Sequence, residues 1–231
     1  MIPRRPFAYA QARMQAGLGF GPDRRFWDRL VGIRDPQLAL RAAADVAFWQ
    51  ELLRSFSLAS DIHTLERAFR AFLREKIQVL AGWVPPAWNA PVEFTARLID
   101  IPVLEHLAQG GRPYSWMEQD PVYAGVAAAA PEDEPERLSL EAWDRTWWCT
   151  MPATPATMRA ALKQFEGRFL EHLRDPSSLG QSDLREDARR LFRRYAGTPV
   201  APFAWLTLVA VDLWRLRGEL MDRFLFERGD S

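Results

Sequence analysis

The sequence feature that most constrains the fold is the last long segment of the chain, residues 199–227 (PVAPFAWLTLVAVDLWRLRGELMDRFLFE). Thr198 can cap a helix that begins there, Pro199 and Pro202 suit its first turn, and no proline follows. A helix of about two dozen residues is about 36 Å long at about 1.5 Å per residue, which is the width of a small domain. We therefore expect a long C-terminal helix that crosses the body of the protein.

The residues of this predicted helix divide into an apolar face and a polar face. At about 100° per residue, the large apolar residues form one stripe, which small and aromatic residues widen. The apolar face contains Leu206, Val209, Ala210, Leu213, Trp214, Leu216, Leu220, Met221 and Phe224. The opposite face contains Asp212, Arg215, Glu219, Asp222 and Arg223. We expect the helix to bury the first face and to expose the second.

Arg217 breaks this pattern, because it lies within the apolar face between Trp214 and Met221. A guanidinium stays protonated in proteins and is costly to bury without a partner. We expect it to meet a carboxylate, carbonyl oxygens or an aromatic ring of another element. Two interpretations stay open: either its stem covers apolar surface while the charge reaches water, or the charge serves a binding partner.

Helical patterns with start and stop signals account for most of the remaining chain. Asp23, the Asp35-Pro36 pair and Asp100 are predicted to begin helices. The predicted helices span residues 7–18, 24–31, 37–56 with a break near Asp45, 60–80, 89–99, 101–108, 139–148, 155–173 and 182–195. No segment keeps the two-residue alternation of strands with turn signals at hairpin spacing. We therefore predict an all-α fold of helix pairs packed in a bundle-like array.

The helical pattern is interrupted between residues 112 and 138. This segment contains Pro113, Pro121 and the acidic cluster of residues 131–136, whose flanking prolines favour an exposed loop. We predict an N-terminal helical unit at residues 1–111, an irregular linker or surface excursion at 112–138, and a C-terminal helical unit at 139–231 that packs on the first.

Charge and cysteine content restrict the class of protein. The 30 basic and 30 acidic residues cancel, with a pI near 6.9, which argues against a nucleic-acid partner. Cys149 is the single cysteine, so no intrachain disulfide framework can form, and a reducing compartment is expected. The N-terminal segment lacks the apolar core of a secretory signal, and the longest apolar run, residues 200–211, is shorter than the roughly 20 residues that cross a bilayer. We expect a cytoplasmic protein.

Residues with catalytic or metal-binding chemistry are few and scattered. His63, His106 and His172 form no H-E-x-x-H pair, and no G-x-x-x-x-G-K-[ST] loop is present. Cys149 follows two tryptophans, which favours a small buried packing residue over a nucleophile. An enzyme would need these residues or acidic side chains to converge in a pocket. We expect no catalytic residue, no cofactor and no metal site.

Three short motifs together resemble the C/d subunit family of V-type and archaeal A-type ATPases. Residues 7–14 (FAYAQARM) are similar to the N-terminal tyrosine-x-x-x-arginine helix of that family. Residues 212–217 (DLWRLR), preceded by residues 199–205 (PVAPFAW), resemble its closing helix. Residues 100–104 (DIPVL) resemble an interior copy of the closing pattern.

The chain also departs from the pattern of this family. Gln15 stands where a second arginine is usual, and Val103 and Arg215 stand where asparagine is usual. Family members contain three related helical units, whereas this chain has room for about two. The resemblance therefore implies a shortened, divergent member.

The resemblance implies a non-catalytic coupling protein: an all-α socket between the proteolipid ring and the central shaft of a rotary, ion-transporting ATPase. Its partners would be rotor shaft proteins and the ring, and it would be peripheral to the cytoplasmic face of a membrane through these proteins. Arg13, Asp100, Asp212 and Arg217 would bind the partner, since charged side chains offer directional hydrogen bonds. The alternative is an all-α adaptor or maturation chaperone that binds one protein client, for which we expect an exposed apolar groove.

Overall fold

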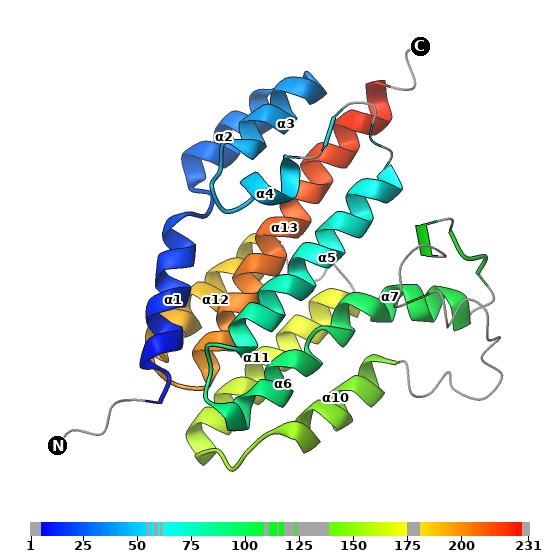
Figure 1. The fold of residues 1–231 in the computed structure, drawn as a ribbon. Coiled ribbons are helices and arrows are strands. Elements are labelled where there is room, and N and C mark those ends of the chain that lie inside the picture. The colour runs from blue at the N-terminus through cyan, green and yellow to red at the C-terminus, as the bar shows by residue number, and fades with distance from the viewer. Residues whose placement is uncertain are drawn as a thin grey trace.

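The fold is all-α in a computed structural model that describes residues 6–54, 56–57, 60, 62–108, 111–114, 116–117, 123, 139–174 and 181–227. Within these residues no strand occurs, so the predicted fold class is confirmed. The elements are α1 (Ala8–Gly19), α2 (Arg24–Gly32), α3 (Pro36–Ala44), α4 (Gln50–Leu53), α5 (Ile62–Ala81), the 3-10 helix η1 (Pro86–Trp88), α6 (Asn89–Phe94), α7 (Arg97–Ala108), α10 (Leu140–Thr150), α11 (Ala156–Arg174), α12 (Gln181–Arg194) and α13 (Val200–Glu227) (Figure 1).

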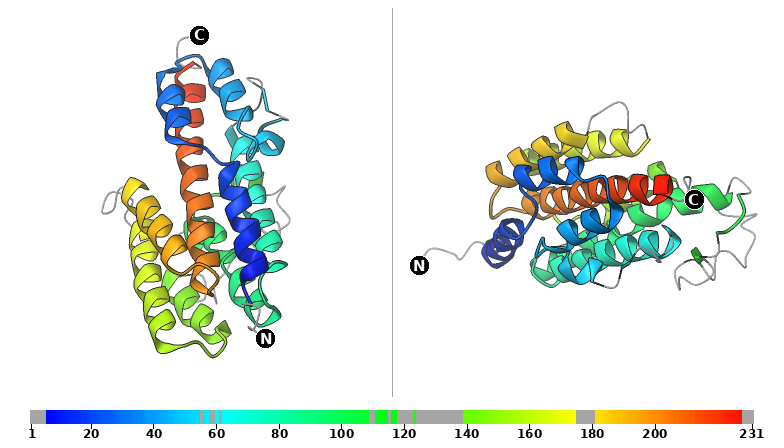
Figure 2. Two further views of the ribbon diagram at one scale, coloured as in Figure 1. Left: turned by 90° about the vertical axis from the view of Figure 1, so that its left-hand side faces the viewer. Right: turned by 90° about the horizontal axis from the view of Figure 1, so that it is seen from above.

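The long C-terminal helix α13 is the centre of the molecule, as predicted. Helices from both halves of the chain surround it, with α12 packed along it most extensively and α5, α3 and α1 on other sides (Figures 1 and 2). Every residue from Ala201 to Leu213 is buried. The predicted apolar stripe is therefore the core of the protein.

The prediction that the polar face of α13 is exposed is wrong for part of its length. Asp212 is only 6% exposed, because α12 covers this side of the helix. The guanidinium of Arg215 lies over the ring of Trp27 in α2 at 4.3 Å, and the side chain of Arg223 is mostly buried. A helix surrounded by neighbours must pair its charged residues within the fold.

Local capping explains where several helices begin. The carboxylate of Asp23 accepts a hydrogen bond from the backbone N–H of Phe26 at 2.7 Å, and that of Asp35 accepts one from Leu38 at 2.8 Å. Both helices therefore begin at the predicted residues, and the break near Asp45 is confirmed because α3 ends at Ala44.

The predicted N-cap role of Asp100 is wrong. Helix α7 begins at Arg97, so Asp100 lies in its first turn and Pro102 lies inside the helix. The carboxylate of Asp100 instead accepts hydrogen bonds from Arg74 in α5 and from Tyr123. These tertiary contacts outweigh the local preference of an aspartate for the cap position.

One large cluster of buried side chains contains residues from α1 through α13, and aromatic residues are prominent in it. The rings of Phe26, Trp27 and Trp49 meet edge to face with centroids 5.1 to 5.6 Å apart. The predicted boundaries at residues 111 and 139 stay a prediction, and most of segment 112–138, with its acidic cluster, lies outside the described residues. Among the described helices, none has the length and apolar composition that a membrane span requires.

Candidate functional site

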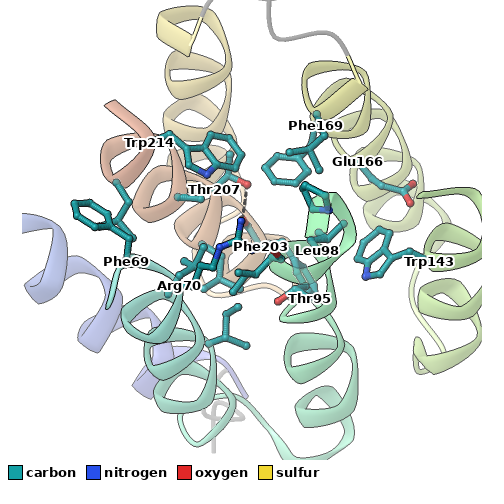
Figure 3. Close-up of a pocket in the computed structure, with 18 of the residues that line it drawn as sticks. Phe69, Arg70, Thr95, Leu98, Trp143, Glu166, Phe169, Phe203, Thr207 and Trp214 are labelled. Atoms are coloured by element: carbon teal, nitrogen blue, oxygen red, sulfur yellow. Dashed lines mark hydrogen bonds between the residues drawn. The ribbon is translucent and has the colours of Figure 1, made fainter. Parts of the chain in front are cut away.

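The strongest candidate for a binding site is an apolar cavity of about 430 Å³ between α5, α7, α10, α11 and α13 (Figure 3). Its volume lies within the range of about 300–1,000 Å³ that is typical of ligand pockets, and helical proteins often form such pockets between helices. Most of the lining is apolar, and its aromatic members are Phe69, Trp143, Trp147, Phe165, Phe169, Phe203 and Trp214.

The cavity reaches the surface of the protein. Leu73, Leu98, Phe169 and Trp214 line it and are only partly buried, and Arg217 at its edge is exposed. Figure 3 shows Phe69 and Trp214 on one side of the cavity, with Glu166 and Trp143 on the opposite side. An apolar surface that is open to solvent on one side is typical of a site for another apolar group.

Arg217 and Arg70 share one carboxylate at an edge of this cavity. The Nε of Arg217 donates to Oε2 of Glu66, and the Nε of Arg70 donates to Oε1 of the same side chain at 2.8 Å. Arg70 also donates from Nη1 to the backbone carbonyl of Ile99 in α7 at 2.5 Å. The expectation that Arg217 meets a carboxylate of another element is therefore confirmed.

The same network continues to the second predicted site residue on this side, Asp100. Its Oδ1 accepts hydrogen bonds from Nη2 of Arg74 at 2.5 Å and from the hydroxyl of Tyr123 at 2.6 Å. Burial and the hydrogen bond to Asp100 raise the pKa of Tyr123 far above its ordinary value, so the phenol stays neutral and donates. Arg70 also reaches this hydroxyl, at 3.3 Å, which joins the two ion pairs.

Glu166 is the buried acidic residue of the cavity wall, with only 7% of its surface exposed. Burial and a hydrogen bond to Asp144 raise its pKa to about 8, although the indole of Trp148 donates to its Oε2 at 3.1 Å. Within the described residues, Oε1 of Glu166 and Oδ1 of Asp144 are both buried without a donor. Near neutral pH the carboxyl group of Glu166 therefore stays mostly protonated, and this side chain adds little negative charge to the cavity wall.

The other two predicted site residues lie outside this network. Arg13 is exposed on α1, with its guanidinium over the ring of Trp83 at 5.1 Å. Asp212 accepts two hydrogen bonds from Arg185 of α12, from Nε at 2.7 Å and from Nη2 at 3.2 Å. The structure therefore brings Asp100 and Arg217 together, and it places Asp212 in a buried ion pair.

The first acidic residue of DIPVL and that of DLWRL each form an ion pair with an arginine. Asp100 begins DIPVL and pairs with an arginine of α5, and Asp212 begins DLWRL and pairs with an arginine of α12. In each case the partner comes from a helix that precedes the motif in the chain. The two pairs differ in geometry, because Asp100 accepts a bond from its arginine and a bond from Tyr123, whereas Asp212 accepts both bonds from Arg185.

The prediction that Cys149 is a buried packing residue is wrong, because its side chain is exposed. Helix α10 buries Leu140, Trp143 and Trp147, which share one face at helical spacing, and Cys149 does not lie on that face. Among the described residues, no group of three His, Cys, Asp or Glu side chains could hold a metal ion. His172, one of the three histidines, packs against the ring of Trp214 at 5.8 Å.

Sequence reasoning missed most of the residues that build the cavity. Glu66 and Arg70 have i,i+4 spacing on the predicted helix at 60–80, which was a usable signal for an ion pair. Nothing in the sequence around Glu166 distinguishes it from an exposed helical glutamate, because its burial depends on where α10 packs.

Comparison of the chain with protein-family models, with curated proteins and with solved structures found no match. The resemblance to the C/d family of rotary ATPases therefore stays a prediction, carried by the three motifs alone.

Proposed function

We propose that this protein is a non-catalytic helical adaptor or maturation chaperone that holds an apolar segment of one protein client in the cavity between α5, α7, α10, α11 and α13. The observation that carries the proposal is the cavity, whose apolar and aromatic walls come from five helices and reach the surface. An apolar cavity that opens to solvent supports the adaptor interpretation, which expects an exposed apolar groove. Such a protein would act in the cytoplasm without a cofactor.

The cavity can contribute binding energy through a small number of client side chains. Burying one Leu, Ile, Phe or Met side chain contributes about 1.5–3 kcal/mol. A client helix would present such residues at i, i+3 and i+4 spacing, which is how grooves of this kind recognise amphipathic helices. The partly exposed Leu73, Leu98 and Trp214 offer the contact surface around these anchors.

A cavity-filling substitution tests the proposal. Ala210 of α13 is buried and lines the cavity, so Ala210→Phe places a ring in the space that the client would occupy. Ala71→Phe is the matched control, because Ala71 is exposed on α5 and does not line the cavity. Affinity purification from the native host, with identification of the bound protein, should recover one client with the wild type and the control, and lose it with Ala210→Phe.

The purified client should then bind the purified chain directly, with the same difference between the two variants. A folded Ala210→Phe variant that binds the client as tightly as the wild type would rule out the cavity as the binding site.

The socket of a rotary ATPase is the second candidate function, and it is favoured by the ion pairs that Asp100 and Asp212 each form with an arginine of a preceding helix. They support the proposal that the chain contains two related helical units, as a shortened member of the C/d family would. Such a protein would be peripheral to a membrane through its partners. It should co-purify with rotor shaft proteins and the proteolipid ring, and recovery of a single unrelated client without them would exclude this role.

A further inference from the structure

We infer that the client segment that enters the cavity carries a side-chain carboxylate, from Asp or Glu, which binds the two Nη groups of Arg217. This inference rests on the proposed function and adds the charge of the segment and the residue that recognises it.

The position of Arg217 suits this role. It lines the cavity, and its side chain is 46% exposed at the edge where the cavity meets solvent. Its Nε is held by Glu66 of α5, which fixes the plane of the guanidinium. Within the part of the chain that the structure describes, neither Nη group has a hydrogen-bond partner. A fixed guanidinium with free Nη groups is suited to binding a carboxylate.

The charge of the surrounding network favours an anion over a cation. Arg70 and Arg217 share the single carboxylate of Glu66, which leaves one positive charge among these three side chains. Both oxygens of Glu66 are already occupied by arginines. Tyr123 is neutral, because burial and its hydrogen bond to Asp100 raise its pKa. A client carboxylate would compensate the remaining charge.

The residues near Arg217 on α13 indicate where the carboxylate would lie in the client segment. Trp214 is one turn before Arg217 on the same helix and lines the same cavity. A bound segment would therefore place its acidic residue beside its apolar anchors, at the edge of the groove. Glu166 on the opposite wall adds little negative charge near neutral pH, because burial raises its pKa to about 8.

Fluorescence anisotropy with three amphipathic leucine–alanine peptides tests this inference. The peptides are identical except at one position beside the leucine face, where they carry Glu, Gln or Lys. The wild type should bind the Glu peptide about fivefold more tightly than the Gln peptide, which is the effect of a half-exposed ion pair of about 1 kcal/mol. The Lys peptide should bind most weakly. Added salt should reduce the difference between Glu and Gln.

Variants of the chain assign the effect to Arg217. In Arg217→Met the preference for Glu over Gln should disappear while binding of the Gln peptide is kept, and Arg217→Lys should keep part of the preference. Arg193→Met is the control for net charge, because Arg193 is exposed on α12 and does not line the cavity, and it should keep the full preference.

Equal binding of the Glu and Gln peptides to the wild type would overturn this inference and leave the proposed function standing. If no peptide binds and Ala210→Phe also keeps its native client, the proposed function fails and this inference fails with it. If Arg217→Met does not fold, the ranking of the three peptides on the wild type and its dependence on salt still decide the question.

Discussion

The buried ion pair between Asp212 and Arg185 offers the sharpest test of how α13 is held in the protein. The side chain of Asp212 is 8% exposed and that of Arg185 is 26% exposed, and two hydrogen bonds join them. Burial raises the pKa of Asp212, and the hydrogen bonds from Arg185 oppose this effect. Removing either partner leaves a charge that the protein interior does not solvate.

The two single substitutions should differ in size and in pH dependence. Breaking a fully buried pair costs about 3–5 kcal/mol. Asp212→Asn should cost about 2–4 kcal/mol, because the stranded guanidinium of Arg185 is a quarter exposed and reaches some water. Arg185→Met should cost about 3–5 kcal/mol near pH 8, because the stranded carboxylate of Asp212 is almost completely buried.

The pH dependence of Arg185→Met follows from the protonation of Asp212. Without Arg185 its pKa in the folded chain rises further above the unfolded value of about 4. The folded chain then keeps a proton that the unfolded chain loses, so the free energy of unfolding falls as the pH rises. Arg185→Met should therefore be less destabilised at pH 5 than at pH 8, whereas the Asp212→Asn variant has no carboxyl group at this position and should lack this contribution to the pH dependence.

Urea unfolding followed by circular dichroism at the two pH values measures both costs, and a constant m-value shows that the same surface is exposed in each variant. A cost below about 0.5 kcal/mol for Asp212→Asn is typical of a surface position and would refute the buried pair. Loss of partner binding by Asp212→Asn without loss of stability would instead support the role that the socket family implies for this residue.

Two further predictions concern the wall of the cavity. The pKa of Glu166 is raised to about 8, so the folded chain keeps a proton that the unfolded chain loses above about pH 4.5. The free energy of unfolding should therefore fall between these two pH values, by at most about 1.4 kcal/mol per pH unit. Urea unfolding at pH 5 and pH 8 should show that Glu166→Gln removes this pH dependence. Trp214 stacks on Phe169 at 5.9 Å but is only partly buried, so Trp214→Ala should cost about 1–3 kcal/mol in thermal or urea unfolding, less than the loss of a fully buried tryptophan. No measurable cost would show that this ring does not pack on α11.

The features that could be predicted from sequence are those that depend on neighbouring residues in the chain. Asp23 and Asp35 cap helices because the donor lies three residues ahead, and the apolar stripe of α13 follows from helical periodicity. The pairing of Arg217 with a carboxylate was also predictable in kind, because a guanidinium on an apolar face needs a partner, although the sequence did not identify Glu66.

The features that could not be predicted depend on which helices become neighbours. Asp212 looked like an exposed residue until α12 covered it, and Asp100 looked like a cap until Arg74 and Tyr123 came within hydrogen-bonding distance. The cavity has no signature in the sequence for the same reason, since its walls come from five helices separated along the chain. Local patterns define elements and faces, but the partner of each face is set by the packing.

Dense packing around α13 favours large buried side chains, whereas the cavity requires small side chains on the same helix. Protein interiors are packed as densely as organic crystals, so an apolar cavity of about 430 Å³ gives up contacts that a larger side chain could make. The small residues Ala210 and Thr207 line this space, within the part of α13, residues 201–213, in which every residue is buried. We expect a larger apolar residue at Ala210 to fill the cavity and to leave the ion pair of Asp212 with Arg185 in place, because Asp212 does not line the cavity. A change that blocks client binding while it leaves the stability unchanged or raises it would therefore assign the space to function.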